Sequence, residues 1–244
     1  MQTATKIAPA PRKRIRAGRI ISALAALLML FGGILKLAKP ASVLQGFAQY
    51  GFPERLVVPV GTIELVSAVL YVIPQTGVLG AILMTGVPAV LGILFWLGLY
   101  LRDDRLRDVF QNEAQPPASK GLIWTGRILS WLTILFMLFD AVLHLIKPAP
   151  VVTGFAQLGV PLQLSMALGI IELVCIAAYA LPRTSLIGAI LLTGYLGGAV
   201  VTQLRVGNPL FGETLFPVYV GVLAWAGLYL RDQRLRTLMP LRRG

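Results

Sequence analysis

Asp140 and His144 carry the side chains in this sequence with the clearest capacity for chemistry. They lie four residues apart within a long apolar stretch, so a helix would place both on one face. A carboxylate beside an imidazole can fix its tautomer, pass a proton or hold a polar ligand. We therefore expect a polar site at this pair. A simple local ion pair at the end of the helix is the alternative.

Two glutamates occupy a matching context in other apolar stretches. Glu64 follows Gly61 by three residues, and Glu172 follows Gly169 by three residues. A charge at the centre of a bilayer costs about 2.5–3.5 kcal/mol on insertion scales, so an acid there usually faces protein and has a partner. Glu64 is interpreted as a structural acid that ties its helix to a neighbour. Glu172 is either a second structural acid or a third member of the polar site.

Arg205 is the fourth candidate, with Tyr195 and Gln203 nearby in the sequence. Its guanidinium could reach back to an acid of the site, or bind an anionic head group or a quinone carbonyl. An interfacial arginine that extends to water is the alternative. The candidate polar site in the membrane is thus Asp140, His144, Glu172 and Arg205.

Soft metal ligands and redox cysteines are scarce. The chain has one cysteine, Cys175, and one histidine. A disulfide framework, a CxxC redox pair and bis-histidine haem ligation within one chain are therefore excluded. We expect no metal, because one histidine and one cysteine supply too few soft ligands. No covalently bound cofactor is expected either.

The elements that must position these residues come in two copies. With a shift of 108 and no gap, 35 of 68 positions are identical between 19–86 and 127–194. The agreement resumes with a shift of 129, where 12 of 16 positions agree between 92–107 and 221–236. We interpret the chain as a tandem duplication in which the first copy lost a segment. The lost segment corresponds to the part of the second copy that holds Arg205.

The composition indicates that both copies lie in a membrane. Apolar residues make up 57% of the chain and charged residues 13%, about half of the charged fraction of a typical soluble domain. Most of the nearly uncharged stretches approach or exceed the roughly 17–25 residues that a membrane-spanning helix needs. They are residues 20–35, 57–73, 78–101, 128–146, 164–181, 186–204 and 215–230. The predicted fold is an all-α polytopic membrane protein with about seven transmembrane helices.

The net charge of +12 is concentrated at the ends of these stretches. Lysine and arginine there hold loops on the cytoplasmic side, against anionic lipid. We therefore expect lipid as the immediate partner, no nucleic acid, and location in the cell membrane. Arginines at both ends of the second copy predict that both of its ends are cytoplasmic.

Each complete copy is expected to form four helices. In the second copy, the first helix opens at Arg127, a turn-rich stretch runs through Gly159-Val160-Pro161, and the second helix reaches Leu181. The expected organisation is a basic tail (1–18), a truncated first repeat (19–107), a linker (108–126), a complete second repeat (127–236) and a basic tail (237–244).

The truncation creates a conflict over topology. Val78 to Leu101 is long enough for one crossing only, which favours one kinked helix and seven crossings. The distribution of lysine and arginine instead favours an even number of crossings. A break at Gly86-Val87-Pro88 that makes a re-entrant hairpin would reconcile the two, as would an inverted orientation of one copy.

Several motifs together resemble the DoxX-like family of small four-helix membrane proteins. They are the run from Ile187 to Ala199, Arg205-Val206-Gly207, Leu228 to Asp232, Lys147-Pro148 and Glu172-Leu173. The resemblance implies a four-helix membrane unit. It also implies a loose association with redox chemistry, because some relatives are subunits of a thiosulfate to quinone oxidoreductase.

Three functions remain open from the sequence. The first is a subunit or accessory of a membrane redox complex, with quinone as the ligand and redox-complex subunits as partners. The second is a small-molecule or proton transporter, and the third is a membrane scaffold without chemistry. The polar groups of the second copy favour the first function.

Overall fold

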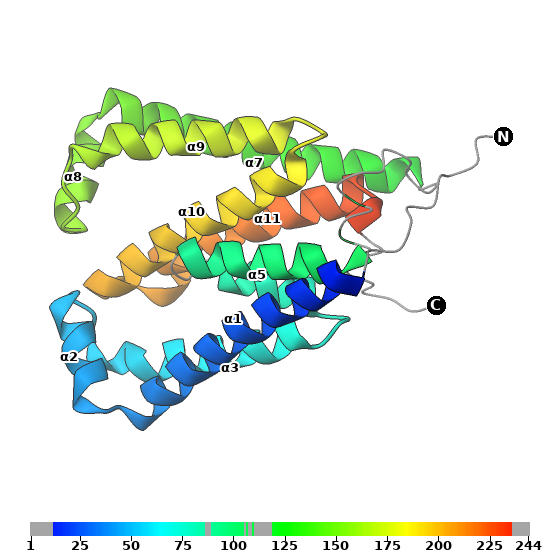
Figure 1. Cartoon of the computed structure of the whole chain (residues 1–244). Coiled ribbons are helices and arrows are strands. Elements are labelled where there is room, and N and C mark those ends of the chain that lie inside the picture. The colour runs from blue at the N-terminus through cyan, green and yellow to red at the C-terminus, as the bar shows by residue number, and fades with distance from the viewer. Residues whose placement is uncertain (1–11, 86–88, 105, 107–108, 110–118, 236–244) are drawn as a thin grey trace. The chain divides into compact units, whose positions relative to one another are not determined.

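The structure, a computed structural model, describes residues 12–85, 89–104, 106, 109 and 119–235 (Figure 1). Its regular elements are all helical, and no β-strand occurs within these ranges. Contacts divide the chain into two units. The second unit is Ser119–Arg231, and the first comprises the residues before 119 together with those after 231. The prediction of an all-α fold is confirmed.

The two units contain similar series of elements. Those of the first unit are α1 (Arg12–Ala38), α2 (Ala41–Gln49), η1 (Glu54–Leu56), α3 (Val57–Val72), α4 (Gly77–Met84) and α5 (Ala89–Arg102). Those of the second unit are α7 (Lys120–Ile146), α8 (Ala149–Gln157), α9 (Leu164–Ala180), α10 (Ser185–Val206), the π-helical turn η2 (Leu210–Thr214) and α11 (Phe216–Arg231).

Local sequence explains both ends of α7. The Ser119 side chain accepts a hydrogen bond from the backbone N–H of Leu122, which caps the first turn. Lys147 ends the helix in the left-handed conformation with φ 53°, and Pro148 follows. The helix thus begins at Lys120 and not at Arg127. Its Ser119 cap lies within residues 108–126, which the sequence predicts to be a linker.

A short helix replaces the turn-rich stretch that was expected after α7. Residues 149–157 form α8, and Pro148 precedes its first residue. Pro150 lies in the first turn of this helix, where the missing N–H of proline leaves no hydrogen bond unmade. The prolines were interpreted as turn signals, but here they begin a helix.

Among the residues that the structure describes, five helices are long and apolar enough to cross a membrane, judged by length and composition. They are Arg12–Ala38, Glu54–Val72, Lys120–Ile146, Ser185–Val206 and Leu210–Arg231. Gly92–Arg102 and Leu164–Ala180 are shorter apolar helices. The predicted count of about seven transmembrane helices is therefore not confirmed within the described residues. Two of the seven predicted stretches do not form helices of that length. One forms α9, which has 17 residues, and the other forms the shorter helices α4 and α5.

The segment from Val78 to Leu101 is not one kinked helix. Arg102, at the end of α5, lies beside Gly77 at the start of α4, where a Cβ would lie 3.3 Å from the Arg102 Nη2. Near the start of α5, a Cβ on Gly92 would lie 3.8 Å from the Thr85 Cα, just after the end of α4. Trp96 Nε1, in the middle of α5, donates a hydrogen bond of 3.1 Å to Thr85 Oγ1. The two helices therefore run antiparallel as a hairpin. The proposed break at Gly86-Val87-Pro88 lies outside the described residues.

The same buried contacts recur in both units. Tyr71 places its hydroxyl 2.8 Å from Ser22 Oγ, and Tyr179 places its hydroxyl 3.0 Å from Ser130 Oγ. Each tyrosine also donates to a backbone carbonyl of the last helix in its unit. These residues match under the shifts found in the sequence. The units therefore share a core in which a buried tyrosine joins three helices. These are α1, α3 and α5 in the first unit and α7, α9 and α11 in the second.

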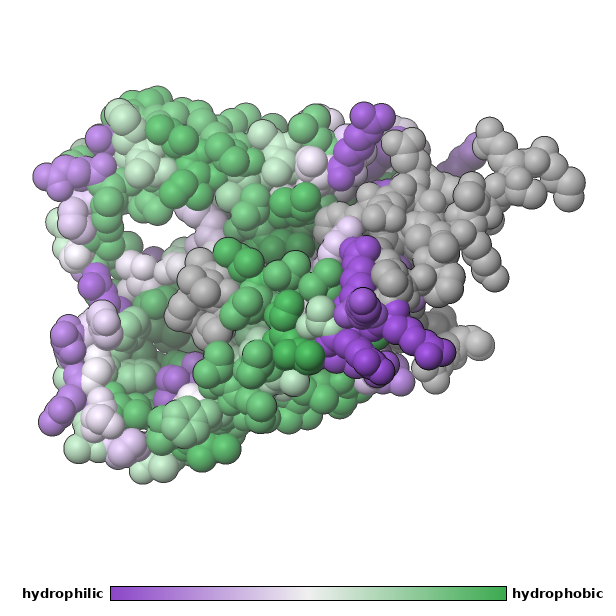
Figure 2. All heavy atoms as spheres, viewed as in Figure 1, coloured by the Kyte–Doolittle hydropathy of each residue, from purple (hydrophilic) through white to green (hydrophobic). Residues whose placement is uncertain are grey.

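Large apolar side chains are exposed along the helices of both units. Figure 2 shows apolar residues covering the long sides of the helices in view, with polar residues gathered towards helix ends. Phe31 of α1 and Trp131 of α7 are 64% and 62% exposed. Such surfaces suit lipid and would be unusual in contact with water.

Candidate functional site

Asp140 and His144 lie in the last two turns of α7, one turn apart. The His144 Nδ1 is 3.7 Å from the Asp140 Oδ2. The same nitrogen is 3.1 Å from the backbone carbonyl oxygen of Asp140. The spacing of four residues therefore places the two side chains together on one face of the helix, as the sequence predicts.

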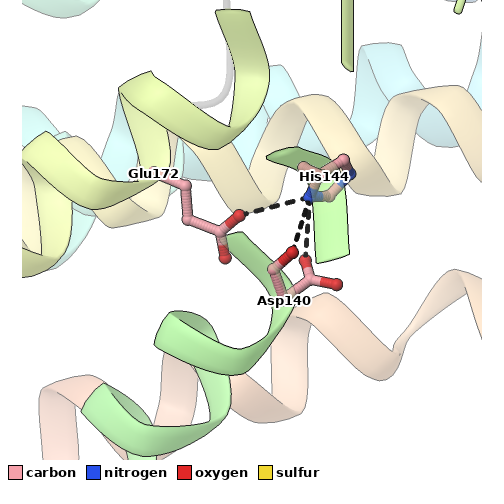
Figure 3. Close-up of side chains that lie close together, drawn as sticks. All are labelled: Asp140, His144 and Glu172. Atoms are coloured by element: carbon pink, nitrogen blue, oxygen red, sulfur yellow. Dashed lines mark hydrogen bonds and ion pairs between the residues drawn. The ribbon is translucent and has the colours of Figure 1, made fainter. Parts of the chain in front are cut away.

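Glu172 reaches this pair from α9 (Figure 3). Its Oε2 lies 3.5 Å from the His144 Nδ1 and accepts a hydrogen bond of 3.0 Å from the Tyr195 hydroxyl of α10. Its side chain is fully buried, and its Oε1 has no hydrogen-bond partner among the described residues. Three helices thus converge on one buried carboxylate.

Small residues allow α7 and α9 to approach at this point. A Cβ on Gly169 would lie 3.0 Å from the Ala141 carbonyl oxygen and 3.1 Å from the His144 Cβ. Only glycine therefore fits without displacing α7. The Ser165 hydroxyl donates a hydrogen bond of 2.7 Å to the His144 carbonyl oxygen and joins the same two helices. The Gly-x-x-Glu spacing thus places the carboxylate beside the imidazole.

Phe155 of α8 covers the imidazole. Its ring packs edge to face against His144 with 5.7 Å between the ring centroids. Phe155 is itself buried. The short helix that the sequence interpretation missed therefore forms one wall of the site, and it shields His144 from one side.

A cavity of about 990 Å³ opens beside these residues. Its wall is mainly apolar and aromatic, and Asp140, His144 and Tyr195 are among the residues that line it. The side chain of Asp140 is 40% exposed, that of His144 is 15% exposed, and that of Glu172 is fully buried. The three groups therefore form a path from the cavity into the protein, with the imidazole between the carboxyl groups.

Arg205 does not join this cluster. Its guanidinium donates hydrogen bonds to the backbone carbonyl oxygens of Leu158 and Gly159, in the loop between α8 and α9. Gly159 has φ 60°, and this left-handed turn presents both carbonyl groups to the arginine. Arg205 thus ties the end of α10 to the loop that follows α8. The expectation that it reaches an acid of the site is wrong for this geometry.

Tyr195, and not Arg205, is the residue of α10 that contacts the Glu172 carboxylate. In the sequence, this tyrosine is noticeable only as a neighbour of Arg205. Tyr195 lies 23 residues after Glu172, across a helical hairpin. It is the one tyrosine of the apolar α10, and this was the signal available in the sequence.

The corresponding position in the first unit holds an ion pair. Lys36 Nζ lies 2.8 Å from the Glu64 Oε2, and both side chains are largely buried. Under the shift of 108, Lys36 corresponds to His144 and Gly32 to Asp140. Glu64 is therefore a paired acid between α1 and α3.

The donor atoms of Asp140, His144 and Glu172 all lie within 4.8 Å of one another. The expectation that no metal binds was based on the numbers of histidines and cysteines alone. The structure adds two carboxylates from two different helices to the single imidazole. Such a cluster can hold a proton between its members or supply three ligands to a cation.

Comparison with known proteins identifies one family. The sequence model of the DoxX-like family matches residues 20–98 and again residues 128–227. The two matches are consistent with a two-fold repeat of one unit. No curated protein and no solved structure matches the chain.

Proposed function

Because this chain belongs to the DoxX-like family and is a membrane protein, we propose that it is a subunit or accessory of a membrane redox complex. Its second unit would bind a quinone. The cavity beside Asp140, His144 and Tyr195 is the observation that carries this proposal. We place the protein in the cell membrane, with lipid and redox subunits as its partners.

The chemistry of the cavity wall suits a quinone. A quinone is a flat apolar ring with two carbonyl oxygens, so it needs apolar walls and a few hydrogen-bond donors. Phe136, Phe155 and Phe216 supply aromatic surface. The His144 imidazole can donate a hydrogen bond, and the Tyr195 hydroxyl can donate one when it gives up its bond to Glu172. The volume of about 990 Å³ is at the upper end of the range for small-molecule sites.

The polar cluster would serve proton transfer. Reduction of a quinone to a quinol takes two electrons, which we assign to a partner redox subunit, and two protons. Asp140 is the most exposed acid of the cluster, and His144 lies between it and the buried Glu172. A proton could therefore pass along hydrogen-bonding groups to the ring oxygen.

We further propose that the chain is a tandem duplication whose second unit alone binds the ligand. The recurrence of the tyrosine contacts at Tyr71 and Tyr179 supports a common origin of the two cores. The Lys36–Glu64 ion pair occupies the position of the polar cluster in the first unit. That unit would then support the assembly without binding quinone.

Titration of the purified protein in lipid nanodiscs with a short-chain quinone tests the proposal. We expect saturable binding. Tyr195→Phe should weaken the binding about fivefold, because a lost hydrogen bond is worth about 1 kcal/mol. Tyr50→Phe is the matched control, since Tyr50 is 71% exposed and lies in the first unit. Absence of saturable binding, or equal binding by both variants, would favour the scaffold function.

A further inference from the structure

The two units differ in how they neutralise a glutamate between helices, which is Glu64 of α3 in the first unit and Glu172 of α9 in the second. In the first unit, Lys36 supplies a fixed cation 2.8 Å from the Glu64 carboxylate. In the second unit, a histidine replaces this lysine, and Asp140 replaces a glycine. The cluster has thus lost a permanent positive charge and gained a second carboxyl group. A cation from outside the chain would restore the balance that the first unit has built in.

The spacing of the three groups suits a bound ion. The His144 Nδ1 lies 3.5 Å from the Glu172 Oε2 and 3.7 Å from the Asp140 Oδ2. Both distances exceed the N–H···O range of about 2.7–3.2 Å, and one ring nitrogen carries only one hydrogen. Ligands of a tetrahedral zinc ion with bonds of about 2.0–2.2 Å lie about 3.3–3.6 Å apart. The distance to Glu172 thus matches an edge of such a site, and the distance of 3.7 Å to Asp140 is slightly longer than one.

The buried carboxylate of Glu172 supplies a second and independent observation. Its side chain is fully buried, and its Oε1 has no hydrogen-bond partner among the described residues. Buried polar atoms are nearly always satisfied, so an orphaned carboxylate oxygen needs an explanation. Figure 3 shows the Glu172 carboxyl group turned towards His144 and Asp140. A cation between the three side chains would lie within reach of this group.

We propose that Asp140, His144 and Glu172 bind a divalent cation of the zinc type. An imidazole with two carboxylates is a donor set for Zn²⁺ and similar borderline ions. The Nδ1 contact with the Asp140 carbonyl oxygen, at 3.1 Å, is given up when the nitrogen binds the ion. The Tyr195 hydroxyl holds the Glu172 Oε2 in place. The cavity beside Asp140 provides the entry path and the remaining coordination position.

The sequence makes this site easy to test. His144 is the only histidine of the chain, so a protein purified with a histidine-free affinity tag has one imidazole. The full chain, stripped with a chelator, is titrated with Co²⁺, whose visible absorption reports the ligand geometry, and then with Zn²⁺ in competition. We expect one equivalent of Co²⁺ to bind in a low-symmetry nitrogen and oxygen environment. Mg²⁺ should not compete, because it prefers octahedral oxygen sites.

The double variant Asp140→Gly with His144→Lys reproduces the first unit's arrangement. It should fold, because the Lys36–Glu64 pair occupies the same framework in the first unit. It should lose Co²⁺ binding at least a hundredfold. Glu64→Gln, in the first unit, and Cys175→Ser are the controls, and both should keep it. Ser67 corresponds to Cys175, so the serine is already accommodated at that position.

Two results would overturn the proposal. One is Co²⁺ binding by the wild-type protein no tighter than by the double variant, which would leave the cluster as a proton site. The other is binding that is lost in Cys175→Ser, which would assign the ion to the thiol. Metal binding is measured without quinone, and quinone binding is measured on the metal-free protein. Failure of this proposal is therefore distinguishable from failure of the quinone site.

Discussion

At the scale of single residues, position 36 and its counterpart 144 separate the two units. Lys36 pairs with Glu64, and its Nζ is also 3.5 Å from the Gly32 carbonyl oxygen. His144 lies between two carboxyl groups and faces a cavity. An ammonium group is a permanent partner for one carboxylate, whereas an imidazole can exchange its proton. This substitution, together with Asp140 in place of Gly32, thus distinguishes a closed ion pair from a reactive group.

Removal of the lysine charge should destabilise the first unit. Lys36→Met leaves the carboxylate of Glu64 without its cation, and we expect a loss of about 1–3 kcal/mol in the free energy of unfolding. The double variant Lys36→Met with Glu64→Gln should recover most of the loss, because the second change removes the unpaired charge. Thermal unfolding in detergent micelles measures both. Equal losses in the single and double variants would show that packing, and not charge, sets the effect.

At the scale of elements, glycines determine how closely the helical hairpins pack. A Cβ on Gly188 of α10 would lie 2.1 Å from the Tyr179 backbone nitrogen, and one on Gly80 of α4 would lie 2.3 Å from the Tyr71 backbone nitrogen. The backbones of α9 and α10 therefore touch in the second unit, and those of α3 and α4 touch at the matching position in the first. This contact places each buried tyrosine so that its hydroxyl reaches the first and last helices.

Gly188→Ala should therefore destabilise the second unit strongly. The new methyl group meets backbone atoms of Tyr179, which cannot rotate away, so we expect a loss of about 2 kcal/mol or more. Gly198→Ala, in the same helix, is the matched control because a Cβ there meets nothing within 4 Å. It should leave stability unchanged or raise it by up to about 1 kcal/mol, as alanine favours helix. Similar melting temperatures for the two variants would contradict this account of the packing.

At the scale of the whole molecule, each unit brings its two ends to one side. A Cβ on Gly18 of α1 would lie 2.7 Å from the Arg102 backbone nitrogen at the end of α5. In the second unit, a Cβ on Gly126 of α7 would lie 2.4 Å from the Arg231 backbone nitrogen. The α4–α5 hairpin makes this possible in the first unit, although α4 and α5 have 8 and 14 residues where α10 and α11 have 22 and 16. The arginines at these ends then agree with the distribution of positive charge along the sequence.

Reporter fusions can test this topology. Reporters at the N-terminus, after residue 112 and after residue 244 should all report the cytoplasmic side, because each unit starts and ends on one side. Insertions at Gly51 and Gly159, in the turns after α2 and α8, should report the opposite side. Opposite sides for the N-terminus and residue 112 would mean that the segment from Val78 to Leu101 crosses the membrane once.

The repeat, the apolar helices and the pair Asp140–His144 could be predicted from the sequence alone, because identity at a fixed shift, apolar length and helical spacing are local properties of a chain. Other features depended on which faces of distant helices meet. The close approach at Gly169 brings Glu172 to His144, and the hairpin of α9 and α10 brings Tyr195. Arg205 reaches carbonyl groups that a left-handed turn at Gly159 exposes. Tertiary packing therefore decided which polar residues share the site, because it alone determines their separation in space.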